Sequence, residues 1–254
     1  MKNISGLIAF SALMVTSMSV SAAEIRVMSG GAPKEVFAQL TPKFEQQTGH
    51  KVVFVYDVLT ALREKIAAGE KADVLVVPVP ILDGYAKDGK LRANSQTTFG
   101  TVGTSVVVKE GSPRLDISTK EKFREALLAA HTVVHATPGK TPSGTHMGKV
   151  MEQLGISDAM AKKVIHRPAL DGGVQLVAEG KAEIGIYPTS EVASVQGISV
   201  VGPLPAGLDF NIQYGGAATA DSAVGDAATA FVKFMAAPEN RDVWKHAGFD
   251  PPTS

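Results

Sequence analysis

The sequence predicts an α/β protein of two lobes with a ligand cleft between them. Continuous apolar runs alternate along the chain with segments whose apolar residues recur at helical spacing. Strands that are apolar on both faces, alternating with amphipathic helices, indicate for each lobe a mostly parallel sheet flanked by helices. The 254 residues, 44% hydrophobic and 20% charged, are enough for two such units in a soluble globular protein.

The first 22 residues are predicted to be a signal peptide. Lys2 supplies the positive start, residues 4–20 form an apolar run, and Ser21 and Ala22 offer small residues for cleavage before Ala23. Serines and threonines interrupt the apolar run, which favours a cleaved signal over a membrane anchor. The chain has no cysteine, which excludes disulfides and a lipidated N-terminal cysteine. We therefore expect a periplasmic protein that is a monomer.

The mature chain opens with three predicted strands joined by two helices. The strands are expected at residues 25–28, 51–56 and 72–78. The first helix begins at Pro33 and ends at Thr48-Gly49, and the second ends at Gly69. This alternation predicts the start of the first lobe.

The pattern changes after Tyr85. Further strands are predicted at residues 104–109, 132–136, 182–187, 198–201 and 210–219. Further helices are predicted at residues 118–131 (with Ser118 as the cap), 142–154, 157–164, from 172, from 189 and at 224–236, before a terminal amphipathic segment at 238–249. The segment from about residue 210 onward has no partner elements of its own, so we expect it to return and complete the first lobe. Lobe 1 is therefore predicted to be 23–103 plus 211–254 and lobe 2 to be 104–210.

Four predicted strand-to-helix junctions share small and hydroxyl residues, at 29–32, 57–60, 141–144 and 171–173. Helix N-termini present free N–H groups that favour an anion, and in α/β sheets such junctions gather at one edge. Glycine and serine also cap helices that bind nothing, so only the four together indicate a site. The predicted ligand-binding residues include Gly30, Gly31, Gly144 and Gly173.

Basic side chains lie in or beside the same junctions. Arg63, Lys140, His146 and Arg167 could meet carboxylates, and arginine binds them with two parallel hydrogen bonds. These residues indicate an organic acid with two or three carboxylates, unless they are solvated surface cations. The net charge of zero excludes nucleic acid as a partner. His131 and His135 lack a matching carboxylate motif, so no metal and no cofactor is expected.

Several motifs resemble the periplasmic molybdate-binding protein family in their order and spacing. They are IRVMSGG at 25–31, FEQQTGHKVVF at 44–54, IAAGEKADV at 66–74, PSG at 142–144 and VAEGKAEIGIY at 177–187. The resemblance implies the type II periplasmic-binding fold, with hinged lobes that close on an anion held by neutral donors. It also implies binding roles for Ser29, Thr60, Ser143, Val174 and Tyr187.

Two junctions depart from the family pattern. Ser29 is followed by two glycines, and the second junction carries Asp57, whose carboxylate is unfavourable beside molybdate. The leading hypothesis is therefore a solute-binding protein that captures an organic carboxylate or an oxyanion for an ABC-type transporter. The alternative is the aconitate isomerase branch of this superfamily, which interconverts trans- and cis-aconitate by allylic proton transfer. Its candidate catalytic residues are Asp57, Lys140, His146 and Tyr187.

Overall fold

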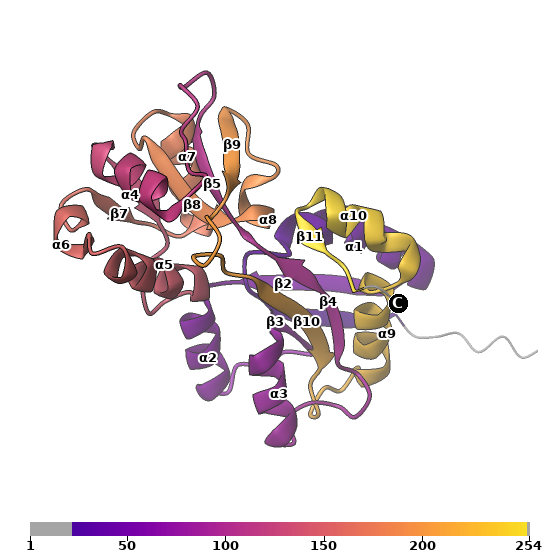
Figure 1. The fold of residues 1–254 in the computed structure, drawn as a ribbon. Coiled ribbons are helices and arrows are strands. Elements are labelled where there is room, and N and C mark those ends of the chain that lie inside the picture. Colours follow the sequence, from indigo (N-terminus) through magenta and orange to yellow (C-terminus); the bar gives the residue numbers. More distant parts are fainter. Residues whose placement is uncertain (1–21, 253–254) are drawn as a thin grey trace, which may run out of the picture.

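The computed structural model describes residues 22–252, which form two α/β lobes lying side by side (Figure 1). The first lobe contains a six-stranded sheet and the second a five-stranded sheet. The first sheet consists of β1 (Glu24–Ser29), β2 (Lys51–Tyr56), β3 (Val74–Pro78), β4 (Thr97–Val102), β10 (Ile212–Ala218) and β11 (Phe249–Asp250). The second consists of β5 (Thr104–Lys109), β6 (Val133–His135), β7 (Val164–His166), β8 (Ile184–Pro188) and β9 (Ile198–Pro203).

Helices flank both sheets. The first lobe has α1 (Lys34–Thr48), α2 (Leu59–Ala67), α3 (Val79–Lys87), α9 (Gly225–Met235) and α10 (Arg241–His246), with a 3₁₀ turn at Pro238–Asn240. The second lobe has α4 (Lys120–Ala129), α5 (Pro142–Gln153), α6 (Ser157–Met160), α7 (Gly173–Ala178) and α8 (Thr189–Val192), with a 3₁₀ turn at Ala169–Asp171. In the first lobe, α2 and α3 lie on one face of the sheet and α1, α9 and α10 on the other (Figure 1).

The two sheets share one strand arrangement. In the first, β2, β1 and β3 are parallel, and β10 and β4 continue the sheet in antiparallel pairings. In the second, β7, β6 and β8 are parallel, and β5 and β9 follow in antiparallel pairings. Both sheets are therefore mixed, and the prediction of mostly parallel sheets was too simple. The strands β5 and β10 enter from the other lobe at the edge where the parallel strands end, so they run against those strands.

The chain passes between the lobes twice. The first passage is at Gly103, between β4 and β5, and the second is the segment 204–211, between β9 and β10. We propose that the lobe boundaries predicted at 103/104 and 210/211 correspond to these passages. Within residues 22–252 the two lobes are joined covalently only there, which is the connectivity that a hinge needs.

Most predicted elements are confirmed, and the differences have local causes. Thr119 rather than Ser118 caps α4, because the Thr119 hydroxyl accepts the N–H of Lys122 at 3.2 Å. The helix predicted at 157–164 ends at Met160, and residues 164–166 form the edge strand β7. The elements α3, β4 and β11 were not predicted.

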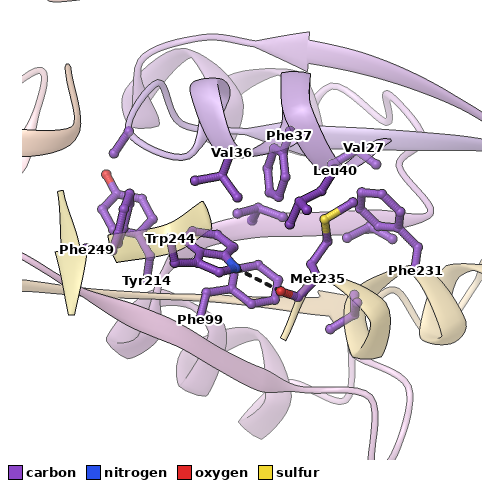
Figure 2. Close-up of a cluster of buried hydrophobic side chains, with 14 of the residues drawn as sticks. Val27, Val36, Phe37, Leu40, Phe99, Tyr214, Phe231, Met235, Trp244 and Phe249 are labelled. Carbon is purple, nitrogen blue, oxygen red and sulfur yellow. Dashed lines mark hydrogen bonds between the residues drawn. The ribbon is translucent and has the colours of Figure 1, made fainter. Parts of the chain in front are cut away.

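The core of the first lobe is aromatic (Figure 2). The Trp244 ring stacks on Phe99 at a centroid distance of 5.0 Å and meets Phe37 edge-on at 6.1 Å. The indole N–H donates to the carbonyl of Met235 at 2.8 Å. Since Trp244 belongs to α10 and Phe37 to α1, this core fastens the C-terminal helices to the N-terminal half of the lobe. The second lobe has a core of its own around Phe123, Leu127 and Met147.

Three further features concern membrane-spanning helices, metal ligands and the predicted signal peptide. No helix within residues 22–252 is long and apolar enough to cross a lipid bilayer. The same residues contain no cluster of three or more His, Cys, Asp or Glu side chains that could hold a metal ion. The predicted signal peptide lies outside the described residues, apart from Ala22.

Candidate binding site between the lobes

A narrow pocket of about 30 Å³ lies between the lobes, at the edge where the parallel strands of both sheets end. The first lobe contributes Gly30 and Gly31 after β1, residues 57–59 after β2, and Ile212 and Tyr214 of β10. The second lobe contributes Ala136, Thr141, Pro142, Ser143, Pro168, Ala169, Leu170, Pro188 and Glu191. Such junctions at the carboxyl ends of strands are where α/β proteins bind their ligands.

A groove of about 310 Å³ adjoins this pocket and shares Leu59, Thr141 and Pro142 with it. It lies between α2 of the first lobe and α5 of the second. We call it the basic groove, because no acidic side chain lines it and four basic residues do: Arg63, Lys140, His146 and Lys149. A solute with several negative groups can therefore contact cations of both lobes here.

Two other cavities are less suited to an anion. A wide groove of about 540 Å³ also borders the pocket, but its charges are mixed: Lys34, Asp57, Glu64, Lys140 and Asp171. A cavity of about 360 Å³ lies within the first lobe, against Ala72 and Thr219, at the opposite edge of the sheet. The pocket and the basic groove together form the candidate site.

The turn after β1 brings bare backbone to the pocket. The N–H of Gly30 donates to the carbonyl of Val76 at 3.1 Å, which fixes the turn on β3. A Cβ atom on Gly31 would lie only 2.8 Å from Cγ of Leu170 in the other lobe, so the lobes touch at a glycine. Ser29 is fully buried, and its hydroxyl donates to the carbonyl of Gly30 at 2.8 Å. Ser29 therefore lies beneath the pocket.

The junction after β2 carries a carboxylate that is already paired. One oxygen of Asp57 accepts from Lys65 Nζ at 2.8 Å, and the other accepts the N–H of Val58 at 2.8 Å. Burial acts to raise the pKa of Asp57, but these two hydrogen bonds outweigh it and hold the pKa below its ordinary value. Asp57 is therefore a carboxylate at neutral pH. Thr60, in the first turn of α2, lines the basic groove.

The start of α5 presents a serine to the pocket. Thr141 caps the helix by accepting the N–H of Gly144 at 3.0 Å. Ser143 is 6% exposed and lines the pocket, with its hydroxyl 3.4 Å from that of Thr141. A Cβ on Gly144 would lie 2.5 Å from the carbonyl oxygen of Ala136, so glycine allows the helix to pack against the end of β6. Ser143 thus faces the cleft and Gly144 supports it from behind.

Three predicted binding residues support the wall of the pocket from beneath. The N–H of Gly173 donates to the carbonyl of Pro168 at 3.0 Å, and Val174 is 1% exposed in the core of the second lobe. The buried Tyr187 hydroxyl donates to the carbonyl of Arg167 at 2.7 Å, and burial raises the pKa of Tyr187. None of the three is among the residues that line the pocket or the two grooves.

His146 is held in place by two contacts. Its Nε2 atom donates to the carbonyl of Leu208 at 2.8 Å, and its ring stacks on Phe210 at a centroid distance of 4.5 Å. The predicted cations Arg63, Lys140 and His146 all line the basic groove, whereas Arg167 is not among its lining residues. Their roles in binding stay predictions.

Glu191 was not predicted from the sequence. It belongs to α8 and lines the pocket together with Tyr214. Within residues 22–252 its carboxyl group forms no hydrogen bond or ion pair, and burial raises the pKa of Glu191 to about 7. The signal that could have found it is the Pro-Thr-Ser run before it, which makes 187–191 a fifth strand-to-helix junction of the same kind.

Replacing Glu191 with glutamine is expected to stabilise the protein at alkaline pH. The folded protein holds a proton on Glu191 up to about pH 7, whereas the unfolded chain loses it near 4.5. Stability therefore falls as the pH rises through this window, and the whole penalty is present above it. We expect Glu191→Gln to raise the free energy of unfolding by about 2 kcal/mol at about pH 8 and to leave it unchanged at about pH 4.

Urea unfolding at both pH values measures this effect. Glu152→Gln is the matched control, because Glu152 is exposed at the far end of α5. Equal stability of wild type and Glu191→Gln at alkaline pH would show that the Glu191 carboxyl is well solvated.

Comparison with known proteins agrees with this geometry. A family model described as bacterial extracellular solute-binding protein matches residues 25–250. An aconitate isomerase of a Pseudomonas species is 26% identical, over 96% of this chain and 95% of that protein. The molybdate-binding protein of Azotobacter vinelandii is 25% identical over 68% of each chain. The solved structure of a periplasmic molybdate-binding protein from that organism covers 90% of this chain and 100% of its own, with a TM-score of 0.75 at 20% identity.

The family match extends over nearly the whole described chain, including every segment that forms the pocket. The structural match confirms the predicted two-lobed fold. The chain therefore belongs to the bacterial extracellular solute-binding protein family, among the relatives of the molybdate-binding proteins and of aconitate isomerase.

Proposed function

We propose that the protein binds a small organic acid with two or three carboxylates between its lobes. The observation that carries this proposal is the basic groove, which Arg63 lines from α2 and Lys140 and His146 line from the second lobe. Arginine binds a carboxylate with two parallel hydrogen bonds, and lysine adds a point charge. Separate carboxylates of one solute can thus engage both lobes at once.

A compact oxyanion fits the site less well. The pocket is lined by the carboxyl groups of Asp57 and Glu191 and by no Lys, Arg or His side chain. An oxyanion held in this pocket would meet the negative charge of Asp57 at close range. An organic acid can instead place its carboxylates in the basic groove and its carbon chain against Leu59 and Leu170 in the pocket.

Binding of this kind couples to closure of the lobes. A solute that contacts both lobes stabilises the closed state by its higher affinity for that state. The family consists of extracellular solute-binding proteins, which supports a role as the receptor of an ABC-type transporter. The proposed location is the periplasm, where a monomer would carry the solute to that transporter.

Removing one cation from the basic groove is expected to weaken binding. We expect Arg63→Ala and Lys140→Ala each to raise the dissociation constant of a tricarboxylate by about 10-fold, because each removes a charge-assisted hydrogen bond. Calorimetric titration with citrate, both aconitates, sulfate and molybdate measures the affinity and ranks the classes of ligand. Arg114→Ala and Lys162→Ala are the matched controls, since both residues are exposed and line neither the pocket nor the basic groove. Tighter binding of molybdate than of every carboxylate would contradict the proposal.

The second candidate function is isomerisation of the bound acid, of the aconitate type. It is favoured by the unpaired Glu191 carboxyl in the pocket, which the receptor function does not need. The Pseudomonas protein that matches 96% of this chain is an aconitate isomerase, which supports the same chemistry. Proton NMR of trans-aconitate incubated with the purified protein tests this function. Appearance of cis-aconitate would establish that the protein is an enzyme. Tight binding without conversion would leave the receptor function as the remaining candidate.

A further inference from the structure

We propose that Glu191 is the catalytic residue that moves the proton between the two allylic carbons of the bound acid. This inference rests on the isomerase candidate described above. Glu191 lines the same pocket as Gly30 and Gly31, and the lobes touch there between Gly31 and Leu170. The pocket joins the basic groove through Leu59 and the first turn of α5, so an acid anchored in the groove reaches the pocket with its carbon chain.

The other titratable groups around Glu191 are already committed. Asp57 is bound to Lys65 and to a backbone N–H, so both its oxygens are occupied. Tyr214 shares the pocket, and burial followed by the charge of Glu191 raises its pKa, so its hydroxyl stays protonated. Tyr187 lies beneath the wall and donates to a backbone carbonyl.

Glu191 itself can change its protonation state under working conditions. Burial raises the pKa of Glu191 to about 7. General acid–base catalysis is most efficient when the pKa of the group lies near the operating pH, because both forms are then available. Its carboxyl also forms no hydrogen bond or ion pair with any other residue of the 22–252 segment. Glu191 is therefore free to accept and to return a proton.

The step balances with this single group. The Glu191 carboxylate removes a proton from the CH₂ group of the acid, and the electron pair of that C–H bond forms the new C=C bond. The pair of the old C=C bond shifts onto the far allylic carbon and its carboxylate, where the negative charge faces the basic groove. Glu191, now a neutral carboxylic acid, returns its proton to that far carbon. The double bond has moved by one position, and no proton, electron or co-reactant is gained or lost.

Deuterium exchange separates this role from binding. Wild type and Glu191→Gln are incubated with trans-aconitate in D₂O, and NMR follows deuterium at the CH₂ group together with the appearance of the cis isomer. Calorimetry gives the dissociation constant of the same ligand for both proteins. Glu152→Gln is the control for loss of an exposed carboxyl, and thermal unfolding confirms that each variant is folded.

We expect Glu191→Gln to reduce exchange and conversion by at least about 100-fold while changing the dissociation constant by less than about threefold. The wild-type rate should rise as the pH increases through about 7, since the carboxylate is the base. Exchange that survives in Glu191→Gln would overturn the proposal. Wild-type protein that binds aconitate without either exchange or conversion would also overturn it and leave the receptor function standing, whereas absence of binding would refute the proposed function itself.

Discussion

Gly31→Val is expected to weaken solute binding by about 10- to 100-fold while the ligand-free protein stays folded. In this structure the first atom of any side chain at this position would lie 2.8 Å from Cγ of Leu170 in the other lobe, a contact that we expect the closed lobes to keep. Overpacking of this kind costs about 1–3 kcal/mol, and the cost falls on the closed state alone because the open state separates the two residues. The apparent affinity decreases with the population of the closed state.

Calorimetry and small-angle scattering, with and without ligand, measure both effects. The double variant Gly31→Val with Leu170→Ala is expected to recover most of the affinity, since it removes the Leu170 side chain with which the new valine would clash. Gly84→Val adds the same volume on α3, where a Cβ meets nothing within 4 Å, and should leave binding unchanged. Full affinity in Gly31→Val would mean that ligand binding does not require this contact between the lobes.

Trp244→Ala is expected to cost about 3–5 kcal/mol of stability, the usual range for removing a buried aromatic side chain. The ring is 1% exposed and is surrounded by Phe37, Phe99 and Phe249. Its removal also leaves the carbonyl of Met235 without its donor. Urea unfolding followed by far-ultraviolet circular dichroism measures the loss, because the fluorophore itself is absent from the variant.

Two further variants separate packing from hydrogen bonding at this position. Trp244→Phe keeps an aromatic ring in the cluster and loses the N–H donor, so we expect an intermediate cost of about 1–3 kcal/mol. Val200→Ala, at a position that is 54% exposed on β9, should change stability by less than about 0.5 kcal/mol. A cost for Trp244→Ala no larger than that of Val200→Ala would show that the C-terminal helices contribute little to the lobe.

Much of the fold could be predicted from local sequence patterns. The apolar run of β3 and the Gly49 stop of α1, at φ +74°, are readable because they reflect burial on both faces and a left-handed C-cap. Strand β4 was missed because its residues, TTFGTV, neither alternate cleanly nor form an apolar run. Strand β7 was missed, and Val164 was assigned to the preceding helix, because three residues that are at least partly exposed carry no periodic signal. Strand direction depends on pairing partners distant in sequence, so the mixed sheets could not be read from patterns.

The candidate site could be predicted by location better than by residue. Three of the four junctions predicted from their glycines and hydroxyls line one pocket, whereas residues 171–173 do not, and the basic groove collects the cations Arg63, Lys140 and His146. Which side chain faces inward depends on the rotation of each strand and helix. This rotation places Ser29 beneath the surface and brings Glu191 into the pocket. The raised pKa of Glu191 arises from tertiary burial, to which no local motif corresponds.

The position of β4 has a consequence for biosynthesis. Both of its hydrogen-bonded neighbours, β10 and β11, come from the C-terminal end of the chain, whereas every strand of the second sheet finds its partners between Thr104 and Pro203. During translation the second sheet can therefore assemble as soon as its own stretch has emerged. In the first sheet, β4 has no hydrogen-bonded neighbour until β10 and β11 have been synthesised. A chain released before that point would therefore expose β4 to proteases and to other nascent chains.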